Sequence, residues 1–312
     1  MKPKKIGIIC GSGIGDGLIM MVAAAHLSMQ SQITIFHEKH RALSVLFPKL
    51  YHWQSYAPKV LISFHLIFMQ YDASQVAHEI LHLRRRKNFP QVIIFFPYKH
   101  PKSLSSDVIF DRSKTMVDNI MSFMKQKFPT PHSSRLSKNG LLIPKGEYRK
   151  YSQRIAIHPT SADRRKNWTP IQFVLLAKKL RLYGYFPVFL VSPQEGYYWK
   201  SFLSSSFPLE CFADLLDVSS YLYESGAFIG NDSGLGHLAS SLQIPTVTIF
   251  SKKSLSPLWN PGFGMHKVVL PYRIPNWKGL SLCFREWFWP ICISTRKVIA
   301  KFLLLMQEIE CI

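Results

Sequence analysis

The sequence predicts an α/β protein of two lobes, each a parallel sheet covered by helices. Short apolar runs alternate with amphipathic helical segments along the 312 residues, a pattern typical of parallel strand–helix–strand units. Glycine-rich turns follow strands at residues 11–17 and 230–236, once in each half. A polar stretch over 129–152 separates the halves, so we expect an N-terminal lobe over 1–150 and a second lobe from 151 onward.

The elements follow from apolar periodicity and capping residues. Residues 60–69 are ambiguous and are taken as a strand with an extension. The other expected strands are 5–10, 32–36, 91–96, 154–158, 186–191, 227–229 and 246–250. The expected helices are 18–30, 72–87, 113–128, 169–183, 195–204, 217–225, 235–242 and 294–308. Ligands of such sheets bind beyond the carboxyl ends of the strands, so we expect the two lobes to face each other across a cleft.

The most informative stretch is 226–245, which contains a buried strand, a glycine-rich turn and a helix in succession. Asp232 or Ser233 is placed to cap the helix. A turn that leads into a helix N-terminus presents unpaired N–H groups and the positive end of the helix dipole, which favours a phosphate. The alternatives are a tight connection without a ligand and, for His237, a core histidine.

The first turn, Gly11-Ser-Gly-Ile-Gly-Asp-Gly, fails the dinucleotide-binding pattern G-x-G-x-x-G. Asp16 occupies the third glycine position and puts a carboxylate where a pyrophosphate would need positive potential. A carboxylate at a helix N-terminus is stabilised as the anion, which suits a general base for a bound hydroxyl. The alternative is that Asp16 only caps the helix that follows.

The loop from His158 to Pro170 is a second phosphate candidate. Thr160 and Ser161 follow a strand end, and hydroxyls together with Lys166 suit phosphate oxygens. For Arg164 and Arg165 we favour an ordinary charged loop.

Several reaction classes lack their motifs. The sequence contains no G-x-x-x-x-G-K-[ST] and no G-x-S-x-G. It also has no Asp-x-Asp pair to hold Mg²⁺ or Mn²⁺ on a nucleotide-sugar diphosphate, so we expect no metal. Lys166, hydroxyls and the helix N-terminus would then stabilise a diphosphate leaving group.

The net charge of +21 favours an anionic partner, such as a membrane surface, an acidic substrate or nucleic acid. No RNA-recognition, zinc-finger or helix-turn-helix signature supports nucleic acid. Five scattered cysteines fit a reducing compartment, and we expect neither a signal peptide nor a membrane span.

These sites together resemble the heptosyltransferase family of lipopolysaccharide core synthesis, glycosyltransferase family 9. The segment from Asn231 to Phe250 looks like its donor-site signature, His158 to Pro170 like its phosphate loop, and Ile14-Gly15-Asp16 like its Gly-Asp turn. The resemblance implies a GT-B fold of two Rossmann-like lobes. It also implies that residues 294–312 form a helix that packs back on the N-terminal lobe, leaving 151–293 as the nucleotide-sugar lobe.

The resemblance implies inverting, metal-independent transfer from a nucleotide sugar, ADP-heptose, without a further cofactor. Asp16 would be the base, Asp232 would bind donor sugar hydroxyls, and Glu195 is a further donor contact. The remaining donor-binding residues would hold the diphosphate: Thr160, Ser161, Lys166, Ser233, Gly234, Leu235, Gly236 and His237. The loop before Lys166 is a residue longer than the common family form. Arg165 is therefore the alternative to Lys166 as the phosphate contact.

The implied acceptor is lipid A-core or another anionic lipid-linked saccharide. This places the protein in the cytoplasm, peripheral on the inner membrane. Two alternatives remain open: transfer of another sugar for surface polysaccharide, and a catalytically silent GT-B-like protein that binds nucleotides or nucleic acid.

Overall fold

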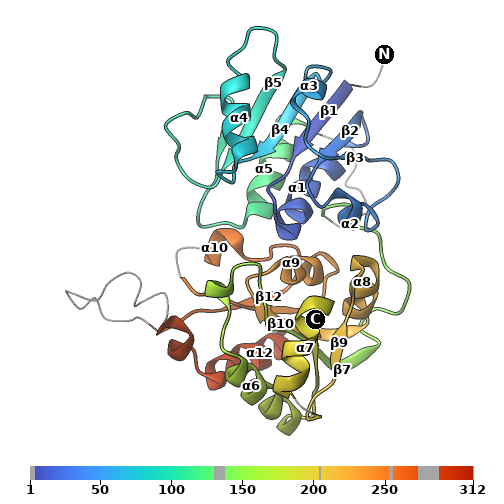
Figure 1. The fold of residues 1–312 in the computed structure, drawn as a ribbon, viewed down its shortest axis with the longest axis vertical. Coiled ribbons are helices and arrows are strands. Elements are labelled where there is room, and N and C mark those ends of the chain that lie inside the picture. Colours follow the sequence, from blue (N-terminus) through green and yellow to red (C-terminus); the bar gives the residue numbers. More distant parts are fainter. Residues whose placement is uncertain (1–3, 130–137, 204, 253–255, 273–287, 312) are drawn as a thin grey trace, which may run out of the picture. The chain divides into compact units, whose positions relative to one another are not determined.

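The computed structural model describes residues 4–129, 138–203, 205–252, 256–272 and 288–311. The chain divides into two compact units, Met1–Ile143 and Pro144–Ile312, and the division falls in the polar stretch expected to separate the lobes. Each unit contains one parallel six-stranded sheet, which confirms the predicted fold class (Figure 1).

The first lobe has the strand order β3-β2-β1-β4-β5-β6. Its strands are β1 (Lys4–Ile9), β2 (Ser31–Phe36), β3 (His52–Gln54), β4 (Leu66–Gln70), β5 (Gln91–Phe96) and β6 (Val108–Ile109). Its helices are α1 (Ile14–Leu27), α2 (His40–Ser44), α3 (Pro58–Leu61), α4 (Gln75–Leu83) and α5 (Met116–Lys127). The ambiguous residues 60–69 therefore contain the end of a short helix and most of strand β4.

The second lobe repeats this topology, with the order β12-β11-β10-β7-β8-β9. Its strands are β7 (Tyr151–His158), β8 (Phe186–Val191), β9 (Leu209–Cys211), β10 (Ser225–Asn231), β11 (Thr246–Ile249) and β12 (His266–Val269). Its α-helices are α6 (Pro170–Leu182), α7 (Pro193–Leu203), α8 (Leu215–Tyr223), α9 (Gly234–Ser241), α10 (Ser256–Trp259) and α12 (Thr295–Glu310), with 3-10 turns η1 (Arg164–Lys166) and η2 (Trp289–Cys292). In both sheets the chain order reverses between the first and fourth strands of the lobe, β1 and β4 or β7 and β10.

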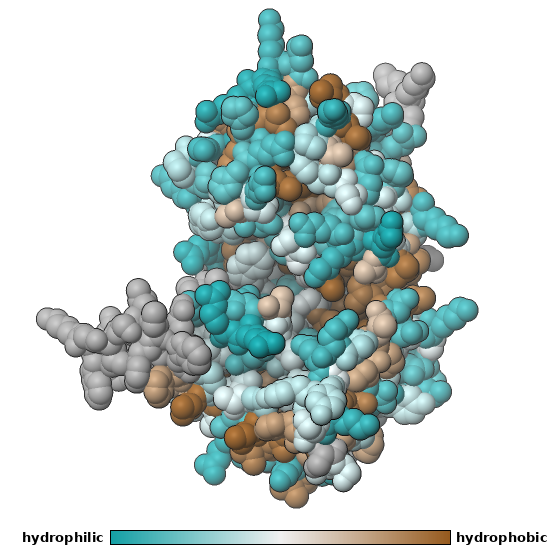
Figure 2. Space-filling view, in the orientation of Figure 1, coloured by the Kyte–Doolittle hydropathy of each residue, from teal (hydrophilic) through white to brown (hydrophobic). Residues whose placement is uncertain are grey.

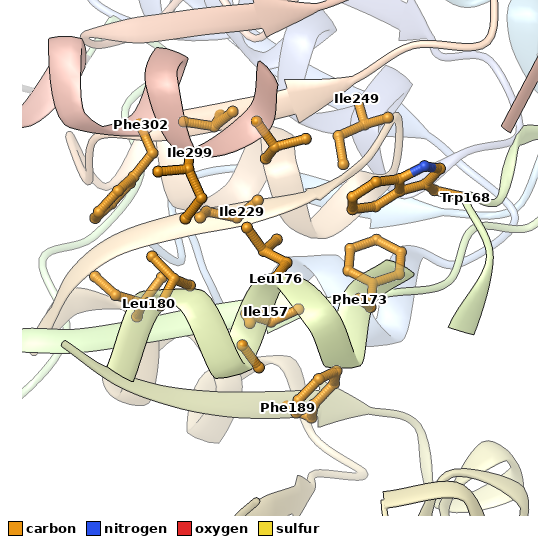
Figure 3. Packing of buried hydrophobic residues seen from close by; sticks show 14 of the residues in the cluster. Ile157, Trp168, Phe173, Leu176, Leu180, Phe189, Ile229, Ile249, Ile299 and Phe302 are labelled. Carbon is orange, nitrogen blue, oxygen red and sulfur yellow. The ribbon is translucent and has the colours of Figure 1, made fainter. Parts of the chain in front are cut away.

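The core of the second lobe forms where helices cover its sheet. Ile157, Ile229 and Ile249 come from neighbouring strands and are fully buried against Phe173 and Leu176 of α6 (Figure 3). Continuous apolar strands of this kind are expected in parallel sheets that are covered on both faces.

The terminal helix α12 differs from expectation. It was predicted to pack back on the N-terminal lobe, but Val298, Phe302 and Leu305 are buried in the core of the second lobe. Its neighbours are α6, β11 and β12. The apolar stripe of α12 therefore fills the sheet face beside α6 and belongs to the second lobe.

Part of the aromatic segment 284–289 lies outside the described residues. Within the described ranges, no helix combines the length and apolar character needed to cross a bilayer.

Candidate functional site

Lys166 and Asp232 meet at the point where the strand order of the second sheet reverses. Lys166 ends η1 after β7, and Asp232 follows the neighbouring strand β10. Lys166 Nζ donates to Asp232 Oδ2 at 2.8 Å, with side-chain exposures of 36% and 11%. The reversal point of an α/β sheet is the usual ligand position, and the ammonium partly neutralises the carboxylate there. Arg165, the alternative to Lys166, instead pairs with Asp163 and is 75% exposed.

Asn231 fixes the loop that carries Lys166. Its side chain is fully buried, donates from Nδ2 to Pro159 O at 2.7 Å, and accepts the Trp168 backbone N–H at Oδ1 at 3.0 Å. Trp168 is buried as well and donates from Nε1 to Pro290 O at 3.0 Å. Both ends of the loop are therefore tied to β10 or to η2. The sequence analysis gave Asn231 no role, because its partners lie 63 and 72 residues away.

The N-terminus of α9 lies directly after Asp232. Ser233 is the N-cap residue in an extended conformation, and its hydroxyl makes no capping hydrogen bond. Its Oγ is buried without a hydrogen-bond partner among the described residues. The first N–H groups of a helix have no intrahelical acceptor, so Gly234 and Leu235 present donors here. Gly236 and His237 already direct their N–H groups to Ser233 O, at 3.1 and 3.4 Å.

The glycines of the segment 226–245 were expected to form a turn, and the structure gives them a different role. Gly230 lies within β10, not in a loop, and an added Cβ would come within 2.8 Å of His158 O. A Cβ at Gly236 would make only ordinary contacts, the nearest at 3.5 Å. The turn between strand and helix thus consists of Asp232 and Ser233, and glycine is required mainly for packing β10 on β7.

Thr160 and Glu195 form a second polar group around His158. His158 Nδ1 donates to Leu190 O at 2.8 Å, and its Nε2 lies 3.4 Å from Thr160 Oγ1. Glu195 Oε2 accepts from the Ser192 hydroxyl at 2.7 Å. Burial acts to raise the pKa of Glu195, but the hydrogen bonds from Ser192 and Thr160 outweigh it, so the pKa is lowered. Burial likewise lowers the pKa of His158, which keeps the imidazole neutral.

Ser161 faces its own loop. Its hydroxyl lies 2.7 Å from Asn167 Oδ1 and 2.8 Å from Asp163 O. This hydroxyl shapes the turn that carries Lys166, and no described contact directs it toward Asp232. The structure thus brings Lys166 and Asp232 together, with Ser233 next in the chain, and shows separate local contacts for Ser161.

In the first lobe, Asp16 lies in the first turn of α1, which begins at Ile14 and not at Leu18 as expected. Its Oδ2 accepts the Gly13 N–H at 3.0 Å, so Asp16 does cap the helix. A Cβ at Gly13 would lie 2.6 Å from Asp16 Oδ2, and one at Gly11 would lie 3.0 Å from its Cγ. The glycines of the first turn therefore make room for this carboxylate.

Gln70 is a partner of Asp16 that the sequence analysis missed. It ends β4 beside β1, is 1% exposed, and donates from Nε2 to Asp16 Oδ1 at 2.5 Å. With Gly13 on one oxygen and Gln70 on the other, the carboxylate is fixed in orientation. Each carboxylate oxygen can accept more than one hydrogen bond.

His37 supports the same turn. Its Nδ1 accepts the Lys39 N–H at 2.8 Å, so Nε2 carries the proton and donates to Gly13 O at 3.0 Å. Burial lowers the pKa of His37, in keeping with this neutral tautomer. Burial and the nearby Asp16 charge raise the pKa of the Cys10 thiol, which keeps it protonated.

Among the residues that the structure describes, no group of three or more His, Cys, Asp or Glu side chains is arranged to hold a metal ion.

Comparison with known proteins relates the second-lobe site to a family. Residues 110–261 match the sequence model of glycosyltransferase family 9 (heptosyltransferase). The segment that carries the second-lobe site is therefore similar to that family. This confirms the resemblance inferred from the sequence, and the family 9 match contains Thr160, Ser161, Lys166, Glu195 and the segment from Asp232 to His237.

Solved structures agree with this assignment at the level of the fold. Escherichia coli ADP-heptose lipopolysaccharide heptosyltransferase II is 17% identical with a TM-score of 0.67, covering 98% of this chain and 99% of that one. A family 9 glycosyltransferase from Veillonella parvula is 16% identical with a TM-score of 0.68, covering 98% of both chains. E. coli heptosyltransferase WaaC with ADP is 12% identical with a TM-score of 0.65, covering 96% and 99%. No curated protein sequence matches significantly.

Proposed function

We propose that this protein is an inverting, metal-independent glycosyltransferase. It moves a sugar from a nucleoside diphosphate, with ADP-heptose as the donor, to a lipopolysaccharide core or another lipid-linked saccharide. The observation that carries the proposal is the Lys166–Asp232 pair of 2.8 Å next to the uncapped N-terminus of α9, inside a family 9 domain.

The second lobe would bind the donor. A lysine ammonium has three N–H donors, and Asp232 occupies one of them, so two remain for phosphate oxygens. The first N–H groups of α9 add donors and the positive end of a helix dipole. Asp232 retains lone pairs for sugar hydroxyls, and its charge beside a diphosphate is tolerable because Lys166 offsets it. Thr160 and Glu195 would contact the donor from their cluster at the end of β7 and the start of α7.

The first lobe would supply the base. Asp16 accepts the proton of the acceptor hydroxyl while the hydroxyl oxygen bonds to the anomeric carbon. The bond between that carbon and the phosphate oxygen breaks, and the nucleoside diphosphate leaves with the bonding pair. Hydrogen bonds from Gly13 and Gln70 hold the carboxylate ready for this step. The configuration at the anomeric carbon is inverted because the hydroxyl attacks and the diphosphate leaves on opposite sides of that carbon.

The choice of ADP-heptose is supported by similar structures, since one is an ADP-heptose lipopolysaccharide heptosyltransferase and WaaC was solved with ADP. The charge of +21 supports an anionic acceptor and an anionic membrane surface as partners. We place the enzyme in the cytoplasm, peripheral on the inner membrane.

The decisive experiment measures nucleoside diphosphate release from a panel of nucleotide sugars, with and without a lipid A-core acceptor. Acceptor-dependent release from ADP-heptose is expected. Release from a different nucleotide sugar would redirect the donor assignment to surface polysaccharide. Binding of ADP without release from any donor would instead indicate a catalytically silent protein.

A further inference from the structure

Helix α6 has two apolar faces. Phe173, Leu176 and Leu180 are fully buried in the second-lobe core. On the opposite side, Ile171 is 64% exposed and Leu182 is 86% exposed. A surface helix of a soluble domain normally carries polar residues on its outer side. The exposed apolar residues on the outer side of α6 therefore indicate a binding surface.

The exposed apolar residues form one stripe. At about 100° per residue, Ile171, Leu175 and Leu182 fall within about 40° of one another around the helix axis. Leu175 is 41% exposed. Helix α12 packs beside α6, joined to it by Lys179 Nζ donating to Thr295 Oγ1 at 2.9 Å. We call Ile171, Leu175 and Leu182 the α6 stripe. Figure 2 shows hydrophobic side chains at the surface in the region of α6.

All charged side chains of α6 are positive. Lys178 is exposed and falls in the same angular sector as Ile171, and Lys179 and Arg181 lie next to it in the helix. Helix α6 contains no acidic residue. Long lysine side chains can lay their methylene groups along apolar surface while the ammonium reaches toward phosphates. Apolar residues with interspersed lysines are typical of helices that lie in a membrane interface.

We propose that the α6 stripe docks on an anionic lipid surface, with the leucine and isoleucine side chains entering the interface and Lys178 contacting headgroup phosphates. A protein partner would require complementary acidic groups of its own, whereas an anionic bilayer supplies them in any orientation. The net charge of +21 favours that same partner. This docking proposal rests on the proposed function in one respect, which is that a lipid-linked acceptor would bring the enzyme to a membrane.

The test compares sedimentation with vesicles of phosphatidylcholine plus phosphatidylglycerol and with pure phosphatidylcholine, at rising salt. Leu175→Ser with Leu182→Ser should weaken binding to the anionic vesicles by about tenfold or more. Lys178→Glu should weaken it too and flatten its salt dependence. Tyr197→Ser is the matched control, because Tyr197 is 89% exposed on α7 of the same lobe; it should bind as the parent does.

Circular dichroism and ADP titration verify that each variant is folded. Vesicle binding does not require turnover, so this test can fail or succeed independently of the proposed function. Parent-like vesicle binding by the double serine variant would overturn the proposal. A change in oligomer mass for that variant, with vesicle binding intact, would also overturn it and assign the stripe to a second copy of this chain.

Discussion

The two lobes share a local structure but differ in the side chains at its helix N-terminus. In each, the first strand leads into a loop or turn beside the fourth strand, where the chain order of the sheet reverses. In the first lobe, Asp16 fills its own helix N-terminus and is held by Gln70 from the fourth strand. In the second, Ser233 leaves the helix N-terminus uncapped, and Lys166 pairs with Asp232 after the fourth strand.

This difference shows why a glycine-rich turn alone does not identify a phosphate site. A carboxylate inside the first helical turn accepts the N–H of the N-cap residue and adds negative charge, which disfavours an anion there. A hydroxyl N-cap without a capping bond adds no charge and leaves the first N–H groups of the helix available. The side chains at the start of the helix therefore set the charge of the turn more than the number of glycines does.

The largest effect is expected for Asp16→Asn, which keeps the shape and an acceptor for the Gly13 N–H but removes the base. Turnover should fall by about 10²- to 10⁴-fold. ADP affinity, measured by calorimetry, should be unchanged because the donor site belongs to the other lobe. Turnover within a few-fold of the parent would mean that Asp16 is only a helix cap.

Lys166→Ala should weaken ADP binding by about 10- to 100-fold, as expected for the loss of charge-assisted hydrogen bonds to phosphate. Arg165→Ala is the matched control, since Arg165 is a neighbouring cation that is 75% exposed and bound to Asp163. Its ADP affinity should stay close to that of the parent. The reverse ranking would transfer the phosphate contact to Arg165.

The sequence predicted the central strands of both sheets and missed the four edge strands, β3, β6, β9 and β12. The central strands are continuous apolar runs because they are covered on both faces. The edge strands have only two to four residues, too few to show a periodicity. Their pairing becomes evident only when the neighbouring strand is in place.

The candidate site residues Asp16, Lys166 and Asp232 were inferred because each follows a strand in the chain, and their roles stay predictions. Gln70 and Asn231 were missed as contributors because their contacts depend on residues at least 54 positions away. The position of α12 was wrong for a similar reason. Its apolar stripe is visible in the sequence, but which lobe it covers depends on tertiary packing.

Ser233→Asp places a carboxylate at the N-cap of α9, whereas α1 carries Asp16 two residues after its first residue, Ile14. The new side chain should cap the helix, leave the free energy of unfolding equal or about 0.5–1 kcal/mol higher, and weaken ADP binding by about tenfold. Ser233→Ala is the control, since it removes the hydroxyl without adding charge and should cost less affinity. Undiminished ADP binding by the aspartate variant would show that the α9 N-terminus does not hold the phosphates.

The smallest effect concerns two buried histidines, one beside each turn. Burial lowers the pKa of His37 and of His158 below the ordinary value of 6.5. As the pH falls below about 6.5, the unfolded chain therefore binds protons before the folded chain does, and the free energy of unfolding decreases. Each histidine contributes at most about 1.4 kcal/mol per pH unit, between its lowered pKa and the ordinary one.

Denaturant unfolding at several pH values between 7.5 and 5 measures this slope. His158→Asn keeps a donor for Leu190 O but cannot take up the proton, so its slope should be shallower than that of the parent. His52→Asn, an exposed change on edge strand β3, should leave the slope as it is. Equal slopes for all three proteins would show that His158 is not held neutral by the second lobe. A shallower slope for His158→Asn would show that the second lobe keeps this imidazole uncharged beside Thr160.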